Sequence, residues 1–272
     1  MSDKLRWVIP APLIIFLAAS WIFVRTENEV RVQVGRAEKQ WRAENYREAV
    51  TLYESVYQNY PKSQYADDVL WEVGTMYYVN FYDVDRALIS FHKLVTQYPD
   101  SPLAAESYLK LAQIHEAELG GLPKAIACWN QLLSLDISRE TLRQARFNIG
   151  NAHFKLNQFE KALGEFQVLM NDGQAGEVTD QARARAGTIM QIQTRYEKSV
   201  EYFTEVLEET NCSDCRRTAR LGLIESYEFL GQLPKAIEVA QTIPTSEFPV
   251  QTKDDLLKRL VEKARYYDPG GQ

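Results

Sequence analysis

Small residues recur along this chain at an almost constant interval, and this repeat is the feature that most restricts its fold. Each one ends a short segment in which polar residues precede Ala or Ser, as in Asn45-Tyr46-Arg47-Glu48-Ala49. The six small residues are Ala49, Ala87, Ala125, Ala162, Ser199 and Ala236. Successive members are therefore 38, 38, 37, 37 and 37 residues apart. A period of this length indicates an array of supersecondary units, each of which stacks on its neighbours.

Larger residues follow the small ones at a distance of four positions. They are Tyr53, Phe91, Trp129, Phe166, Phe203 and, in the sixth segment, Ala240. Positions i and i+4 share one face of a helix, so small and large side chains alternate along a packing seam. A further small residue lies 12 or 13 positions before the Ala or Ser of most repeats. It indicates a preceding helix, because a small side chain permits two helices to approach closely. These residues are Gly74, Ala112, Gly150 and Gly187.

Proline and serine separate the units. Tyr60-Pro61-Lys62-Ser63 and Tyr98-Pro99-Asp100-Ser101-Pro102 each end one helix and begin the next. We expect Ser63 and Ser101 to be N-caps and Pro102 to occupy the first helical position. Each unit is then a helix-turn-helix hairpin, and the chain is all-α with about six hairpins.

One hairpin resembles the tetratricopeptide repeat (TPR) family, whose pattern is W-x-x-L-G-x-x-Y followed by Ala, Phe, Ala and Pro. The matching residues are Leu70, Val73, Gly74, Tyr77, Ala87, Phe91, Leu94 and Pro99. The resemblance covers roughly residues 30–244 and implies an α-solenoid, a right-handed superhelix that binds other proteins. The long period and Tyr-Pro-x-Ser are similar to the bacterial periplasmic subgroup, which includes the BamD-type lipoprotein and the TPR protein of the Tol–Pal system. This chain lacks a lipidation cysteine near its apolar segment.

The N-terminal segment from Trp7 to Val24 carries no charged residue. Ten of its residues are Val, Ile, Leu or Phe, and together they favour membrane insertion by roughly −3 to −6 kcal/mol. We expect a transmembrane anchor over 7–24, or else an uncleaved signal, after a short tail over 1–6. Cleavage after Ala18-Ala19-Ser20 is the alternative. The layout is similar to that of inner-membrane TPR proteins with a single N-terminal span.

The repeat and the apolar N-terminal segment together set the boundaries of the other parts of the chain. The TPR array covers 30–244, and a C-terminal capping helix with its tail covers 245–272. Localisation at the inner cell membrane, with the repeats outside the cytoplasm, is the main expectation. Basic residues on both sides of the span leave a cytoplasm-facing array as the alternative.

Composition excludes several classes of function. The net charge of −6, with basic and acidic residues interspersed, argues against a nucleic-acid partner. Motifs for nucleotide, metal or acyl-transfer chemistry are absent, so we expect no cofactor, no metal and no enzyme.

Cys212 and Cys215 form a single C-x-x-C. Inert cysteines are the main expectation there, with a local disulfide, or metal or redox chemistry, as alternatives.

A binding groove follows if the first helix of each hairpin lines the concave side, as the TPR resemblance implies. The residues beside the packing stripe then face a partner. They are Trp71, Thr75, Tyr78, Leu109, Gln113, Glu116, Phe147, Asn151, Phe154, Thr188 and Gln191. Aromatic residues on a solvated face favour protein binding, although packing between repeats is equally consistent with Trp71, Phe147 and Phe154.

The predicted function is that of a membrane-anchored scaffold or adaptor that binds partner proteins during envelope or membrane-complex assembly. Its partner would be a peptide or helix held through apolar and amide contacts. The alternative is a permanently assembled accessory subunit of a larger membrane complex. An obligate, largely buried interface would favour that second reading.

Overall fold

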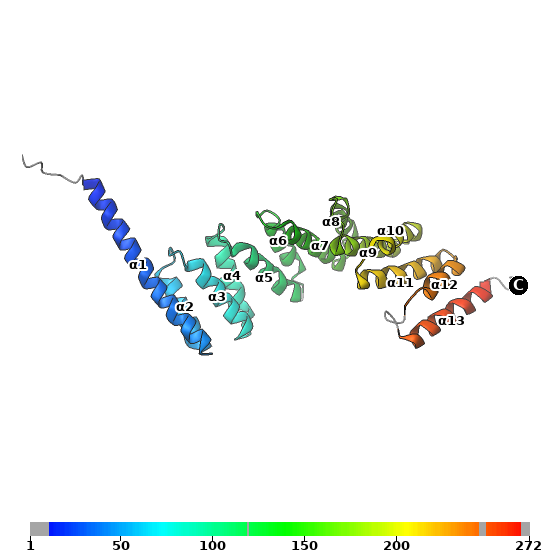
Figure 1. The fold of residues 1–272 in the computed structure, drawn as a ribbon, viewed down its shortest axis with the longest axis horizontal. Coiled ribbons are helices and arrows are strands. Elements are labelled where there is room, and N and C mark those ends of the chain that lie inside the picture. The colour runs from blue at the N-terminus through cyan, green and yellow to red at the C-terminus, as the bar shows by residue number, and fades with distance from the viewer. Residues whose placement is uncertain (1–10, 119, 245–248, 268–272) are drawn as a thin grey trace, which may run out of the picture. The chain divides into compact units, whose positions relative to one another are not determined.

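The computed structural model describes residues 11–118, 120–244 and 249–267 of the chain. Within these residues, thirteen helices follow one another and no strand is present (Figure 1). The predicted all-α helical repeat is thereby confirmed. The superhelical hand of the array stays a prediction. The helices divide into two compact units, residues 1–121 and 122–272.

Unit 1 contains two hairpins and the first helix of a third. Its helices are α1 (Ala11–Arg42), α2 (Tyr46–Asn59), α3 (Ala66–Val79), α4 (Val84–Gln97) and α5 (Ala104–Ala117). Each helix packs against the next one along the chain. Local contacts of this kind are what a repeat array uses to build its core.

Unit 2 begins inside the predicted third hairpin, because its first helix is the second helix of that repeat. Its helices are α6 (Leu122–Leu132), α7 (Arg139–Lys155), α8 (Phe159–Asn171), α9 (Glu177–Ile192), α10 (Tyr196–Glu209), α11 (Ser213–Phe229), α12 (Leu233–Gln241) and α13 (Val250–Tyr267). Consecutive helices pack together, and α9 also contacts α7 and α11. The first helices of successive hairpins therefore form a row.

The predicted packing seam is present in every repeat. All six small residues and all six residues four positions later are buried. In three hairpins an aromatic ring of the second helix fills the space left by a glycine of the first. The pairs are Gly74–Phe91, Gly150–Phe166 and Gly187–Phe203. A Cβ atom added to any of these glycines would lie 2.6–2.8 Å from the nearest ring carbon, which real Cβ atoms do not tolerate.

The sixth hairpin exchanges the sizes of the two positions. Ile224, twelve residues before Ala236, stands where other repeats have glycine, and Ala240 stands where they have an aromatic ring. Both are buried in one cluster with Ile243 and with Leu260 of α13. The large side chain on the first helix therefore compensates for the small one on the second, and α13 closes the core, as the predicted capping helix would. Residues 245–248 and 268–272 of the predicted C-terminal region lie outside the described residues.

Each hairpin turn contains one residue with left-handed backbone. The six residues are Glu44, Tyr82, Gly120, Asn157, Thr194 and Gly231, each five positions before its small residue. In the fourth hairpin, the N–H of Gln158 donates to the carbonyl of His153, and that of Asn157 donates to Phe154. These two bonds are a Schellman motif, which satisfies carbonyls at a helix end. The same pair of bonds recurs in the first, fifth and sixth hairpins, at Glu44, Thr194 and Gly231.

Ser63 and Ser101 are not the N-caps predicted from the sequence. The helices begin at Ala66 and Ala104, after N-cap residues Tyr65 and Leu103 that provide no side-chain cap. The Ser63 hydroxyl accepts from the N–H of Tyr65 and donates to the Glu27 carboxylate at 2.7 Å. A serine hydroxyl in a tight turn can accept a backbone N–H and still donate, and the turn places it beside the preceding hairpin.

The same hydroxyl-to-carboxylate bond recurs twice more. The Ser101 hydroxyl donates to Asp67 at 2.6 Å, and the Thr210 hydroxyl donates to Asp180 at 2.5 Å. Each hydroxyl also accepts the N–H two residues further on, from Leu103 and from Cys212 respectively. We call these three bonds the hairpin tethers, because each joins the start of one hairpin to the first helix of the preceding one. Pro102 accordingly precedes α5 and is not its first residue.

The N-terminal helix is continuous from Ala11 to Arg42, so the apolar segment and the first helix of the array are one element. Within the described ranges, no helix is both long enough and apolar enough to cross a membrane. Residues 1–10, which include the tail and the start of the predicted anchor, lie outside the described residues.

The fit of Phe166 against Gly150 can be tested with a matched pair of glycines in one hairpin. In Gly150→Ala the new Cβ would lie 2.6 Å from Phe166, and we expect a loss of about 1–3 kcal/mol of stability. Gly164 lies on the exposed face of α8 with nothing within 4 Å of its Cβ position. Gly164→Ala should therefore stabilise by about 0.5–1 kcal/mol through helix propensity. Urea unfolding of both variants measures the difference, and equal shifts would contradict the packing described.

Candidate protein-binding groove

A hollow of about 740 Å³ lies in unit 1, with walls from α1 and α3 and a floor that includes Tyr53 of α2. We call it the α1–α3 groove. Its lining residues are Arg31, Val34, Gly35, Glu38, Trp41, Arg42, Tyr53, Tyr65, Asp68, Val69, Trp71, Glu72 and Thr75. This volume is in the range of pockets that hold small ligands or peptide side chains.

Two tryptophans give the groove apolar contact area. Trp71 is half-buried, and its ring centroid lies 5.4 Å from that of Phe91 in α4. Trp41, on the last turns of α1, is 45% exposed. Tryptophan is enriched among the residues that dominate binding energy at protein interfaces. Trp41 therefore offers a large surface that no other part of the described chain covers.

Three carboxylates make the groove electronegative. Burial raises the pKa of Glu72, and the nearby Asp68 and Glu38 raise it further. Burial also raises the pKa of Asp68, with Asp67 adding to the effect. Within the described part of the chain, neither Asp68 nor Glu72 forms an ion pair with Lys or Arg, whereas Glu38 contacts Arg42 at 3.7 Å. Asp68 and Glu72 therefore lack a paired cation, and the three carboxylates of the groove outnumber its two guanidinium groups, those of Arg31 and Arg42.

Burial and two of the same carboxylates affect the pKa of Tyr53, whose side chain lies at the floor of the groove. Burial raises the pKa of its hydroxyl, and Glu72 and Glu38 raise it further, while Arg42 lowers it. Thr75 supplies a polar atom of another kind, because its hydroxyl oxygen is buried without a hydrogen-bond partner among the described residues. A polar atom left in this state favours a ligand that can satisfy it.

The residues predicted to face a partner occupy several different environments. Trp71 and Thr75 line the α1–α3 groove, whereas Tyr78 is exposed near the end of α3. On α5, Leu109 and Glu116 are half-buried and Gln113 is exposed. Of the unit 1 residues, Trp71 and Thr75 are the two among those lining the α1–α3 groove.

In unit 2, three of the predicted residues make contacts within the protein. Phe147 is 8% exposed, and its ring centroid lies 5.8 Å from that of Phe166. The Thr188 hydroxyl donates to the Ala184 carbonyl at 3.0 Å. The Gln191 amide donates to the Gly222 carbonyl at 3.0 Å and so joins α9 to α11.

The other two predicted residues of unit 2 are only partly covered. Phe154 is half-buried, and its ring centroid lies 5.7 Å from that of Phe159. The guanidinium of Arg185 lies 5.4 Å from the Phe154 ring centroid. The Asn151 side-chain oxygen is buried without a partner among the described residues.

Trp41, Glu38, Asp68 and Glu72 were not predicted from the sequence. Trp41 follows the apolar N-terminal segment on the same helix, and the i+4 pattern of the repeat begins only at Ala49. The available signal was Ala37, which is twelve residues before Ala49, fully buried, and equivalent to the glycines of later repeats. That spacing makes the end of α1 the first helix of a hairpin and places Trp41 beside the groove.

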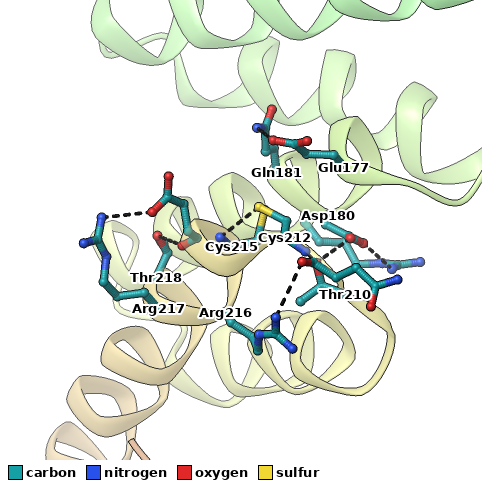
Figure 2. Close-up of a disulfide and its surroundings, with 12 residues drawn as sticks. Glu177, Asp180, Gln181, Thr210, Cys212, Cys215, Arg216, Arg217 and Thr218 are labelled. Carbon is teal, nitrogen blue, oxygen red and sulfur yellow. Dashed lines mark hydrogen bonds and ion pairs between the residues drawn. A yellow bond between two sulfur atoms is a disulfide. The ribbon is translucent and has the colours of Figure 1, made fainter. Parts of the chain in front are cut away.

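Cys212 and Cys215 form a disulfide at the start of α11 (Figure 2). The structure thus has the local disulfide, one of the alternatives left open by the sequence, in place of two free cysteines. Cys128 of α6 is a buried free thiol, and burial raises its pKa.

The electronegative groove predicts a specific dependence of stability on pH. A carboxyl whose pKa is raised by folding destabilises the folded state above that pKa, and the effect disappears below the unfolded value of about 4.3. Glu72→Gln should therefore raise the melting temperature at pH 7, and its advantage over the unmutated protein should vanish as the pH falls to about 4. Glu29→Gln, at an exposed position of α1, is the control and should leave the melting temperature unchanged. A larger advantage of Glu72→Gln at low pH would contradict this assignment.

The comparison with protein-family models supports the repeat. Residues 34–63 and 68–101 match the tetratricopeptide repeat model, and they include most of the residues that line the groove. No curated protein shows significant sequence similarity to the chain.

Solved structures share the fold at low sequence identity. A tetratricopeptide repeat protein from Parabacteroides merdae ATCC 43184 is 14% identical, with a TM-score of 0.52 over 87% of this chain and 99% of that one. The MamA protein is 18% identical, with a TM-score of 0.51 over 74% of this chain and 96% of that one. A chain of the Naa15/Naa10 structure bound to HypK-THB is 17% identical, with a TM-score of 0.59 over 91% of this chain. Only 36% of that chain is covered. Residues 34–63 and 68–101 therefore match the tetratricopeptide repeat in sequence, and further helical hairpins follow them.

Proposed function

We propose that the chain is a scaffold whose α1–α3 groove binds a partner protein. The observation that carries this proposal is the combination of exposed Trp41, partly exposed Trp71 and an excess of carboxylates over guanidinium groups around one hollow. A folded chain gains nothing from burying carboxylates near one another, because like charges raise each other's pKa and destabilise the fold. Residues of this kind are expected where a ligand supplies the missing positive charge.

The chemistry of the groove favours a segment that carries Lys or Arg beside apolar side chains. A cationic side chain can pair with Glu72 or Asp68 and also lie over a tryptophan ring, which attracts cations through its π face. Apolar neighbours in the same segment would cover Trp41. An amphipathic helix or an extended peptide both satisfy these requirements, since helices and strands bind in grooves through alternating anchors.

The proposal is tested with two synthetic peptides that differ only in charge. One is an amphipathic peptide with leucines on one face and lysines on the other, and the second has glutamates in place of the lysines. Fluorescence anisotropy with the full chain should show binding of the lysine peptide alone, weakened by added salt. Glu72→Lys should reverse the preference between the two peptides. Equal binding of both peptides to the unmutated protein would refute the electrostatic part of the proposal.

Trp41→Ala separates binding from folding. Trp41 is 45% exposed, and no ring contact in the described chain involves it, so its loss should change the thermal melt little. Removal of an interface tryptophan typically weakens binding by 2 kcal/mol or more, about thirtyfold. Tyr82→Ala is the matched control, because Tyr82 is an 83% exposed aromatic residue of unit 1 outside the groove. A Trp41→Ala variant that binds the lysine peptide as tightly as the unmutated chain excludes this groove as the site.

The same proposal includes attachment to a membrane through residues 7–24. Six apolar side chains in the described part of this segment are more than half exposed. They are Phe16, Leu17, Trp21, Ile22, Phe23 and Val24. A contiguous apolar surface on an isolated helix indicates a site of membrane or protein contact. The repeats would then lie outside the cytoplasm, which the Cys212–Cys215 disulfide supports, since disulfides persist in oxidising compartments. A role in envelope or membrane-complex assembly follows from this placement and from the periplasmic-type repeat period.

Membrane attachment is tested by alkaline extraction of membranes from cells that express the full chain or residues 25–272. The full chain should stay in the membrane pellet, and the truncated chain should be released. Protease added to intact spheroplasts should remove the repeats of the full chain. Protection of the repeats from protease would place them in the cytoplasm and contradict the proposed side.

A further inference from the structure

The Cys212–Cys215 disulfide joins two residues of a single helical turn, so it links no two helices. Cys212 is the N-cap of α11, and Cys215 lies in its first turn. The helix would be in place without the bond, because Thr210 fixes the chain just before it. The Thr210 hydroxyl donates to buried Asp180 of α9 and accepts the N–H of Cys212 at 3.0 Å. A disulfide that adds no connection between elements calls for a role other than holding the fold together.

The two sulfur atoms differ in exposure and in hydrogen bonding. Cys212 is partly exposed, whereas Cys215 is 3% exposed and belongs to a core cluster with Ala219 and Leu223. The sulfur of Cys212 accepts the backbone N–H of Cys215 at 3.0 Å. A cysteine sulfur at the N-terminus of a helix, with an N–H directed at it, is stabilised as a thiolate.

The same capping bond occurs at α7, where the Ser138 hydroxyl accepts the N–H of Thr141, and α11 differs from α7 in that its capping atom is sulfur. The N-caps Tyr65 and Leu103 follow the Ser63 and Ser101 tethers by two residues, as Cys212 follows Thr210, and neither provides a side-chain cap. Cys215 corresponds in the same way to Asp68, which lines the α1–α3 groove. The disulfide therefore lies where unit 1 presents groove residues.

A hollow of about 260 Å³ lies beside Cys215 in unit 2. Its lining residues are Phe147, Gln181, Ala184, Arg185, Asp214, Cys215 and Thr218. Phe147 gives it an apolar wall, and Gln181 offers an amide. A small thiol compound can reach the Cys215 side of the pair through this hollow, whereas a partner disulfide approaches Cys212 from its own partly exposed side.

The charged groups around the pair favour thiolate over thiol. The cations are Arg185 of α9 and Arg216 of α11, and Figure 2 shows Arg216 near the start of that helix. Arg217 is neutralised by its ion pair with Asp214. The nearby anions are engaged by other groups. Asp180 accepts from Thr210, and Asp214 pairs with Arg217 at 3.2 Å. Glu177 is exposed at the start of α9.

We propose that Cys212 and Cys215 are a redox-active pair that exchanges disulfides with a partner's cysteines, with Cys212 as the nucleophile and Cys215 as the resolving residue. In the reduced protein, the Cys212 thiolate attacks a partner disulfide. A bond forms between Cys212 and one partner sulfur, and the other partner sulfur leaves with the electron pair and takes a proton from water.

The Cys215 thiol then loses its proton to water and attacks the sulfur of Cys212. The Cys212–Cys215 bond forms, and the bond to the partner breaks, so the partner leaves with two thiols and the pair is oxidised. A dithiol reductant reverses the sequence. The tether at Thr210 and the N–H of Cys215 hold Cys212 in place in both redox states, so the cycle requires no unfolding of α11.

The experiment uses the full chain with Cys128→Ser, which removes the third thiol, and oxidised glutathione as the probe disulfide. The two single-cysteine variants add Cys215→Ser or Cys212→Ser. Mass spectrometry follows the mixed disulfide with glutathione at pH 6, where an ordinary thiol of pKa about 8.5 is almost wholly protonated. Cys212 should react at least tenfold faster than Cys215, because it is the exposed and thiolate-stabilised sulfur.

Two outcomes would overturn the proposal. One is a Cys212 rate that falls tenfold with each pH unit from 8 to 6, since that is the behaviour of an ordinary thiol. The other is accumulation of the glutathione adduct when both cysteines are present, since Cys215 should release it. The second measurement uses the unmutated pair, so it remains decisive if a single-cysteine variant fails to fold. Circular dichroism melts establish which variants are folded.

Discussion

In three hairpins, the ring of a phenylalanine lies against a helix where a glycine leaves room for it, and the spacing of the array depends on this contact. Phe166 and Gly150 illustrate it, since a single added carbon would come within 2.6 Å of the ring. The two helices can approach closely only because one partner is large and the other has no side chain. The sixth hairpin reaches the same volume with Ile224 and Ala240 in exchanged roles. The total volume at the seam is thus conserved while its distribution between the helices varies.

The hairpin tethers determine where functional side chains can lie. Each tether fixes the residue that precedes the first helix of a hairpin, and therefore fixes which face of that helix points away from the core. In the second hairpin, exposed Asp68 and half-buried Trp71 and Glu72 form a wall of the α1–α3 groove. In the sixth hairpin the corresponding start of the helix carries Cys212 and Cys215. The same backbone device thus presents acidic and aromatic residues at one end of the chain and sulfur at the other.

The helices and their packing seam could be predicted from the sequence, because they depend on residues at fixed separations. Ala87 with Phe91, and Gly74 twelve or thirteen positions earlier, are legible as periodicity alone. The tethers could not be predicted in this way. Ser63 has the sequence context of an N-cap, and its bond to Glu27 depends on a residue 36 positions away.

The groove residues were predictable only in part, because some of them also depend on contacts that periodicity does not reveal. Trp71 and Thr75 follow from their places beside the packing stripe, and both line the α1–α3 groove. Trp41 was missed because its helix begins as an apolar segment and continues without interruption into the array. The buried contact of Phe147 with Phe166 depends on side-chain volume across two helices, which periodicity does not report.

The hairpin tethers also have a direction along the chain. In all three, the carboxylate belongs to the earlier hairpin and the hydroxyl to the later one. A ribosome that makes the chain from its N-terminus therefore completes each acceptor before the donor that needs it emerges. The first acceptor, Glu27, lies on α1, in the helix that also carries the apolar segment. Assembly of the repeats can thus proceed hairpin by hairpin from that helix, and the second, third and sixth hairpins each meet a carboxylate that is already in position.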